Sequence, residues 1–141
     1  VVTTTVSNGA PVGMTVSSFN TVSLDPPLVL WNLGNESCNF EAFSQATHFA
    51  VHVLAADQQA LSSRFAARGE EKFEGLECGA GVEGDPILPE FAACFECRTE
   101  FQYAGGDHVI IVGRVTNFED RGREPLIFHR SQYRTTTGNM S

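Results

Sequence analysis

Short apolar runs rich in β-branched residues alternate with turn-forming residues along the first part of the chain. Val1–Val6 and Pro11–Phe19 flank Ser7-Asn8-Gly9, and an Asn-Gly pair between two such runs is a strong hairpin signal. Leu24-Asp25-Pro26-Pro27 then interrupts the pattern before the apolar run Leu28–Leu33, because adjacent prolines are tolerated ahead of a strand and not within it. This part of the chain therefore predicts a hairpin followed by a further strand.

The middle of the chain alternates between helical and strand spacing. Asn35–Phe43 places aromatic residues three apart and predicts a short helix, whereas His48–Leu54 returns to a strand pattern. Asp57 is a suitable N-cap for a second helix. That helix would run to the start of Gly69–Pro89, a segment rich in glycine, proline and acidic residues that predicts a loop.

The last part of the chain predicts three more strands, Phe91–Tyr103, Asp107–Phe118 and Leu126–His129. Ala104-Gly105-Gly106 forms the turn between the first two, and the polar segment Thr135–Ser141 predicts a loose tail. Six or seven strands joined mostly by tight turns, with two short helices inserted, favour a closed or partly closed antiparallel barrel over a doubly wound sheet.

Composition narrows the classes of function. The 141 residues fit a single domain, and a net charge of −8 with Lys72 as the only lysine argues against a nucleic-acid surface. The chain has no run of about 18 apolar residues, so the sequence predicts no membrane-spanning helix. The absence of a secretory signal pattern and the few cysteines favour the cytoplasm. The chain begins at Val1 within a predicted strand, so we expect a missing upstream element.

Two patterns suggest metal ligands at first. Cys94 and Cys97 form a CxxC pair, but no second pair follows, and the local pattern is that of a strand. His48 and His52 would lie about 13 Å apart on a strand, too far to share one metal ion. We therefore expect buried free cysteines, structural or surface histidines and no metal site.

Two further patterns resemble catalytic or nucleotide-binding motifs. Gly79–Gly84 matches GxGxxG, but Asp85 and Pro86 follow where the dinucleotide-binding motif requires a helix, so a loop is expected. Ser17 and Ser18 lack a GxSxG context or a His-Asp partner, which argues against a nucleophile. Small polar residues at a strand end can instead bind the rim of a planar heterocycle or a phosphate. A strand that merely carries small polar residues is an equally good interpretation.

The segment Pro11–Leu33, PVGMTVSSFNTVSLDPPLVLWNL, resembles the flavin reductase-like domain family of short-chain flavin:NAD(P)H reductases. Ser37–Phe40, Phe49–Leu54, Leu61–Phe65 and a group near the C-terminus formed by Gly106–His108 and Leu126–Tyr133 extend the resemblance over nearly the whole chain. The implied fold is mainly β: an FMN-binding split β-barrel, Greek-key-like and antiparallel, with short inserted helices, in one domain over residues 1–141. The family usually carries a helix before the first strand, so the resemblance also implies a truncated N-terminus.

The resemblance also implies roles for individual residues. His108 would position the nicotinamide, with His129 and Tyr133 on the same side. His52 stands where the family commonly has asparagine, and Trp31 is bulkier than usual and would narrow the ring pocket. The implied flavin-binding residues are Met14, Thr15, Val16, Ser17, Ser18, Trp31, Asn32, Leu33, Ser37, Cys38, Arg64 and Phe65.

The activity that the resemblance implies is NAD(P)H-dependent reduction of FMN or FAD by a homodimer, with reduced flavin diffusing to a partner monooxygenase. Hydride transfer between two cofactors requires positioning and no catalytic triad. Two alternatives stay open: a tightly bound flavin that reduces a ferric chelate or a corrinoid, and a non-catalytic flavin-binding module. The sequence does not distinguish FMN from FAD or NADH from NADPH.

Overall fold

A computed structural model describes residues 1–67, 71–129 and 132–135 of the protein, and from residue 127 onward only the backbone is described. Within these residues the main element is a seven-stranded sheet in the order β2-β1-β5-β8-β9-β4-β3. All of its neighbouring strands are antiparallel. The strands are β1 (Val2–Ser7), β2 (Ala10–Thr15), β3 (Phe19–Leu24), β4 (Pro27–Gly34), β5 (His48–Val53), β8 (Ala93–Gly105) and β9 (His108–Asp120).

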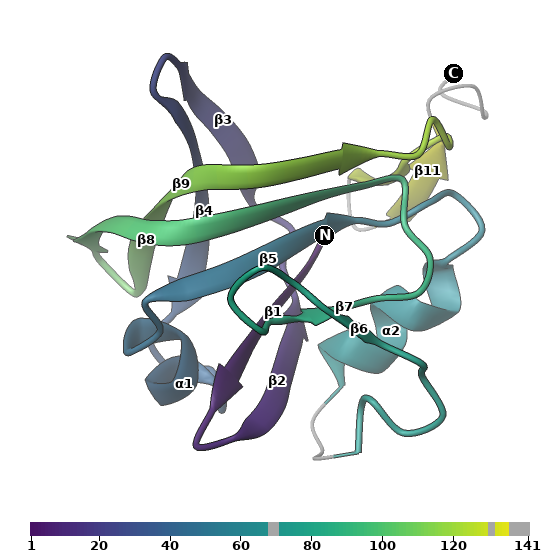
Figure 1. Ribbon diagram of the computed structural model, residues 1–141, viewed down its shortest axis with the longest axis horizontal. Coiled ribbons are helices and arrows are strands. Elements are labelled where there is room, and N and C mark those ends of the chain that lie inside the picture. The colour runs from purple at the N-terminus through teal and green to yellow at the C-terminus, as the bar shows by residue number, and fades with distance from the viewer. Residues whose placement is uncertain (68–70, 130–131, 136–141) are drawn as a thin grey trace.

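The remaining elements are short. Two helices, α1 (Phe40–Ser44) and α2 (Gln59–Ala66), lie on the side of the β1–β2 hairpin in Figure 1, while β8 and β9 run across the molecule. Two small pairs complete the described elements: β6 (Gly79–Ala80) with β7 (Pro86–Ile87), and β10 (Leu126–His129) with β11 (Gln132–Thr135). The predicted class, mainly β and antiparallel with two short helices, is confirmed.

The two edge strands of the large sheet are consecutive in the chain. β2 ends at Thr15 and β3 begins at Phe19, so only the segment 16–18 joins them. The four Cα–Cα steps from Thr15 to Phe19 span at most about 14 Å. The opposite edges of the sheet must therefore approach each other at this link, which curls the sheet towards a barrel and places the segment 16–18 at its seam.

Several predicted boundaries need correction. The run Pro11–Phe19 is two strands and not one, because the polar pair Ser17 and Ser18 leaves the β2 ladder and the exposed edge strand β3 follows. The first predicted helix begins at Phe40 and not near Asn35. The preceding residues form tight turns that close the β4–α1 connection.

The second helix also starts differently. Asp57 is not its N-cap, because the Asp57 carboxylate accepts a 2.6 Å bond from Arg123 and lies one residue before the observed cap, Gln58. The predicted end of the helix near Gly69 lies outside the described residues. The predicted loop contains the β6–β7 pair, and no described helix follows the GxGxxG pattern, as expected.

The core consists of two apolar clusters. The first surrounds Trp31, whose ring packs edge-on against Phe43 at 5.2 Å and Phe49 at 5.8 Å between centroids. The second lies beneath α2. Cys97 belongs to the first cluster and Cys94 to the second, and burial raises the pKa of both thiols to about 12. The prediction that they are buried free cysteines is confirmed.

The two histidines of β5 have structural contacts. His52 is fully buried, and its ring bridges the Val2 carbonyl, 3.1 Å from Nδ1, and the Leu88 amide, which donates to Nε2 at 3.1 Å. Burial lowers the pKa of His52 to about 4. His48 contacts the Asp85 carboxylate at 2.8 Å. These contacts hold the segment around β7 against β1 and β5.

Neutral His52 makes the stability of the fold depend on pH. Its pKa is about 4 when folded and 6.5 when unfolded. Its contribution is therefore complete above pH 6.5 and is lost as the pH falls towards 4, by an amount on the order of 3 kcal/mol. Urea unfolding between pH 7.5 and 4.5 should show a steeper loss of stability for the wild type than for His52→Gln. A His108→Gln control should keep the wild-type slope, and equal slopes for wild type and His52→Gln would contradict the assignment.

Gly13 allows α2 to pack closely on β2. A Cβ atom there would lie 2.7 Å from the Phe65 ring and 2.9 Å from the Phe73 ring. We expect Gly13→Ala to reduce the free energy of unfolding by about 1–3 kcal/mol, because either the rings or the strand must move. Gly79→Ala is the matched control, since nothing lies within 4 Å of that position. Equal denaturation midpoints for the two variants would contradict the close-packing argument.

Candidate functional site

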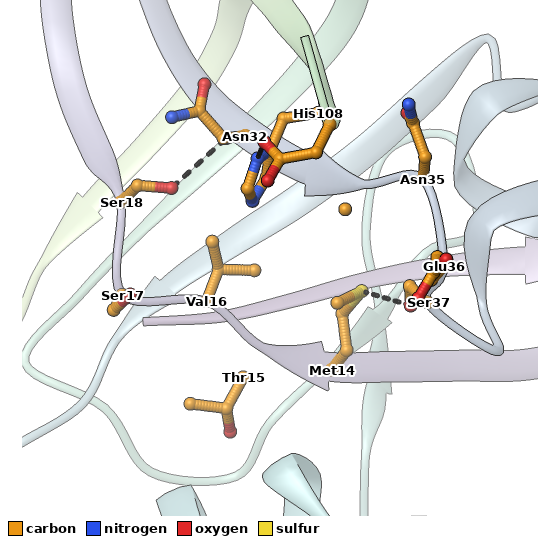
Figure 2. A pocket seen from close by; sticks show the side chains of 12 residues that line it. Met14, Thr15, Val16, Ser17, Ser18, Asn32, Asn35, Glu36, Ser37 and His108 are labelled. Carbon is orange, nitrogen blue, oxygen red and sulfur yellow. Dashed lines mark hydrogen bonds and ion pairs between the residues drawn. The ribbon is translucent and has the colours of Figure 1, made fainter. Parts of the chain in front are cut away.

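A cavity of about 560 Å³ opens at the seam of the sheet. Residues 14–18 run along one side, Asn32 and His108 lie across from them, and residues 35–37 close one end, as Figure 2 shows. Its lining comprises Met14, Thr15, Val16, Ser17, Ser18, Asn32, Gly34, Asn35, Glu36, Ser37, Asp107 and His108. Three segments distant in sequence thus meet around one space.

The β2–β3 link is held on both flanks while its middle faces the cavity. The Thr15 hydroxyl donates to the Ser62 carbonyl of α2 at 2.6 Å, and Val16 is buried in the core. On the other flank the Ser18 hydroxyl accepts a 3.3 Å bond from the Asn32 amide of β4. The shape of this wall is therefore set by α2 and β4, which are parts of the rigid fold.

The far end of the cavity is a set of interlocked turns. Gly34 pairs with His108 in the β4–β9 ladder. Asn35 donates its amide to the Asp107 carbonyl at 2.9 Å and its side-chain Nδ2 to the Gly106 carbonyl at 3.2 Å. Gly106 has a φ of +74°, a conformation that favours glycine in this tight hairpin. These bonds fix the β8–β9 turn, and with it His108, against the entrance to α1.

His108 is half exposed at the mouth of the cavity, and its Nδ1 lies 2.6 Å from Asp107 Oδ1. A carboxylate at Nδ1 favours the tautomer that carries the proton there, which leaves Nε2 as the free ring nitrogen. Asp107 is itself strongly exposed, so this contact orients the imidazole more than it stabilises the fold.

The chemistry of the donors fits a flat polar ligand. In the described part of the chain, the backbone N–H groups of Ser17 and Ser18 donate to no other residue. Two adjacent free donors at the edge of a cavity of this size can bind ring nitrogen and oxygen atoms of a planar heterocycle. The apolar side chains of Met14 and Val16 belong to the same wall and can contact the ring itself.

A smaller cavity of about 200 Å³ continues from this one, since both are lined by Met14, Thr15, Glu36 and Ser37. Its lining adds Cys38, Asn39, Phe65, Ala66, Ala67 and Lys72. Lys72 is a residue that the motif-based reading did not select as a site residue. Its being the only lysine of an acidic chain is the one sequence signal that could have pointed to it.

Most of the predicted site residues meet at these two cavities. The larger one brings together Met14, Thr15, Val16, Ser17, Ser18, Asn32, Ser37 and His108, and the smaller one adds Cys38 and Phe65. The sequence reading missed Gly34, Asn35, Glu36 and Asp107. These residues lie in turns. Backbone pairing between distant segments, and not the residue type, determines which turn residues line the cavity.

Other predicted site residues lie elsewhere. Trp31 and Leu33 have no exposed surface and pack in the core, because the alternation along β4 turns them away from Asn32. Trp31 therefore neither walls nor narrows the cavity. Arg64 lines neither cavity and instead donates to the carbonyls of Glu71 and Glu74.

Some assignments fall outside what the structure describes. The side chains of His129 and Tyr133 lie outside the described residues, as do residues 136–141 of the predicted tail. Among the described residues, no group of three or more histidine, cysteine, aspartate or glutamate side chains is arranged to hold a metal ion. None of the described helices is long and apolar enough to cross a membrane.

Comparison with known proteins agrees with the geometry. Residues 1–137 match the model of the flavin reductase like domain. The chain belongs to this family. A relative from Agrobacterium fabrum, named FMN reductase (NADH) SmoA, is 51% identical over 128 residues, which cover 91% of this chain and 72% of the relative. The reductase component of a flavin-dependent trigonelline monooxygenase from Acinetobacter baylyi is 37% identical over 96% of this chain, which spans only 44% of that relative.

Solved structures of family members share the fold. The NADH:FAD oxidoreductase SgcE6 of Streptomyces globisporus, in complex with NAD and FAD fragments, superposes with a TM-score of 0.89 at 34% identity and covers 99% of this chain and 87% of its own. BorF, the flavin reductase component of a bacterial two-component tryptophan halogenase, gives a TM-score of 0.85 at 34% identity, with 95% and 86% covered. The predicted split β-barrel and the family resemblance are therefore confirmed.

Proposed function

We propose that this protein uses a reduced nicotinamide coenzyme to reduce FMN or FAD. The observation that carries the proposal is the cavity at the seam, which is lined by Ser17, Ser18 and His108 in a chain of the flavin reductase family. The backbone N–H groups of Ser17 and Ser18 donate to no other residue that the structure describes. The relatives named as FMN reductase (NADH) and as NADH:FAD oxidoreductase support the same activity.

The chain would position the flavin and the nicotinamide and form hydrogen bonds with them. The flavin and the nicotinamide supply the hydride chemistry when both are bound. Met14 and Val16 would contact the flavin ring, while the N–H groups of Ser17 and Ser18 would bind its polar edge and stabilise the negative charge that reduction places there. His108, oriented by Asp107, would position the nicotinamide across the same space.

Two relatives favour NADH as the coenzyme, since they are named FMN reductase (NADH) and NADH:FAD oxidoreductase. Glu36 and Asp107 are the acidic lining residues of the cavity, and His108 is the one lining residue that can become positive. A phosphate of the coenzyme that reached the mouth of this cavity would meet these like charges.

The finer parts of the proposal concern assembly and partners. We propose a homodimer, supported by large apolar side chains that are exposed on two strands of the large sheet, Leu24 on β3 and Phe101 and Tyr103 on β8. We also propose that reduced flavin diffuses to a partner monooxygenase in the cytoplasm. Relatives named as reductase components of such enzymes, and the free cysteines, support this part.

Steady-state oxidation of NADH and NADPH, with and without added FMN or FAD, tests the activity. The proposal expects flavin-dependent NADH oxidation. Flavin that stays bound through gel filtration, with turnover only when an external acceptor such as a ferric chelate is added, would identify a reductase with a resident cofactor instead. No oxidation of either coenzyme with either flavin would overturn the proposal.

Filling the cavity should weaken flavin binding without disturbing the fold. Ser17 is exposed and its side chain is not part of the core, so Ser17→Trp should fold normally and raise the Kd for flavin roughly tenfold or more, since 1.4 kcal/mol corresponds to a factor of ten. Fluorescence titration with FMN measures the effect. Glu77→Trp, at an exposed position that lines neither cavity, is the control. Unchanged FMN affinity in Ser17→Trp would place the flavin elsewhere.

Coenzyme preference should follow the two acidic residues. We expect kcat/KM to be about tenfold higher for NADH than for NADPH, which corresponds to one or two like-charge contacts near a surface. The double variant Glu36→Gln, Asp107→Asn should narrow this gap, whereas Glu77→Gln should not. A wild-type preference for NADPH would contradict the electrostatic argument.

A further inference from the structure

His108 stands at the end of a hairpin that has little packing to hold it. Residues 100–108 are all exposed, and the ladder between β5 and β8 ends at Arg98. His108 is the first residue of β9 and pairs with Gly34, the last residue of β4. Exposed strand ends open more readily than the core of a fold, because few apolar contacts hold them. A further contact is therefore needed if His108 is to keep a fixed position at the cavity.

Asn35 supplies this contact with two donors on consecutive carbonyls of the turn. Its backbone amide donates to the Asp107 carbonyl at 2.9 Å, and its side-chain Nδ2 donates to the Gly106 carbonyl at 3.2 Å. Any residue other than proline at position 35 could form the backbone bond. The bond to Gly106, by contrast, depends on the asparagine side chain.

The imidazole of His108 lies against the residue that precedes Asn35. A Cβ atom at Gly34 would lie 4.0 Å from both Cδ2 and Nε2 of His108, so the ring packs over the backbone there. Asp107 Oδ1 contacts the other ring nitrogen, Nδ1, at 2.6 Å. Because Asp107 and His108 belong to the turn or follow it directly, a shift of the turn would move Nε2 relative to residues 14–18 across the cavity.

We propose that Asn35 is a positioning residue for hydride transfer, whose side chain fixes the β8–β9 turn so that His108 can hold the nicotinamide over the flavin. This inference rests on the proposed function and adds a residue to it. Asn35 lines the cavity, but in Figure 2 its side chain is directed away from residues 14–16 on the opposite wall. It therefore acts through His108 and not by touching the reacting rings. A displacement of about 1 Å in a reacting pair can cost roughly a hundredfold in rate, so one bond at the turn is sufficient to affect the reaction.

Two other roles for Asn35 predict different results. If its side chain only stabilised the fold, a similar bond elsewhere on the same hairpin should matter as much. Gln102 offers this comparison, because its Nε2 donates at 2.8 Å to the Ser44 carbonyl from an exposed position on β8. If Asn35 instead contacted the bound flavin or coenzyme, the effect of removing it should add to the effect of removing His108.

Single-turnover reduction of flavin by NADH, with the full chain in excess over flavin, measures the hydride step. We expect Asn35→Ala to slow flavin reduction about tenfold while the Kd for flavin stays within about twofold of the wild type. Asn35→Gln, which keeps an amide donor, should recover part of the rate. Gln102→Ala should reduce flavin at the wild-type rate. A wild-type rate in Asn35→Ala, or an equal loss in Gln102→Ala, would overturn the inference.

A double-mutant cycle with His108→Ala tests whether Asn35 acts through His108. Residues that act as a unit have non-additive effects. Asn35→Ala should therefore change the rate of flavin reduction by less than about twofold once residue 108 has been replaced by alanine. An equal loss of rate with and without His108 would show that Asn35 acts on the ligand by itself, and this result would reject the positioning role.

Amide hydrogen exchange gives a readout that does not depend on turnover. The backbone amides of residues 105–108 should exchange several-fold faster in Asn35→Ala than in the wild type, and Gln102→Ala should leave them unchanged. The outcomes also separate this inference from the proposed activity. A wild type that reduces no flavin would reject both. An active wild type, with the same rate and the same exchange in Asn35→Ala, would keep the reductase and reject the positioning role alone.

Discussion

The site depends on the close approach of α2 to β2 at Gly13. Because no side chain stands at this position, the Phe65 and Phe73 rings reach the backbone of the strand. The same strand continues through Thr15, whose hydroxyl is held by the Ser62 carbonyl of α2. The helix therefore fixes the strand end that forms the cavity wall, and it brings the Phe65 carbonyl close enough for Lys72 to bridge it to Gly13. Packing at one glycine thus positions both the ring cavity and the nearby cation.

Buried and cavity-lining polar groups differ in the partners they find. Deep in the fold the ring of His52 is satisfied by Val2 and Leu88, whereas Thr3 Oγ1 and Trp31 Nε1 are buried without a partner among the described residues. At the seam, the N–H groups of Ser17 and Ser18 and one donor of Lys72 have no partner among the described residues. Since unpaired donors are disfavoured except where a ligand or water meets them, their concentration here is a physical sign of a binding site. It also suits a reaction in which the cofactors react and the protein holds them.

Much of the fold could be predicted from the sequence because its signals are local. The Asn8-Gly9 pair predicted the first hairpin, and the long apolar runs predicted β8 and β9. The edge strand β3 was missed, because an exposed strand needs no clear apolar alternation. Asp57 looked like a helix cap, but a charge contact with Arg123, distant in sequence, determined its role.

Only those parts of the site that a family motif covers could be predicted from the sequence. Residues 14–18 were found because the family motif covers them, whereas Trp31 and Leu33 were assigned to the cavity although the alternation of β4 turns them into the core. Lys72 was missed because tertiary packing brings it to the smaller cavity, and Asp107 was missed because only its neighbour His108 was assigned a role. The most direct test of the account is a crystal structure of the protein with FMN. The ring should lie between residues 14–18 and His108, and a flavin bound anywhere else would contradict the account.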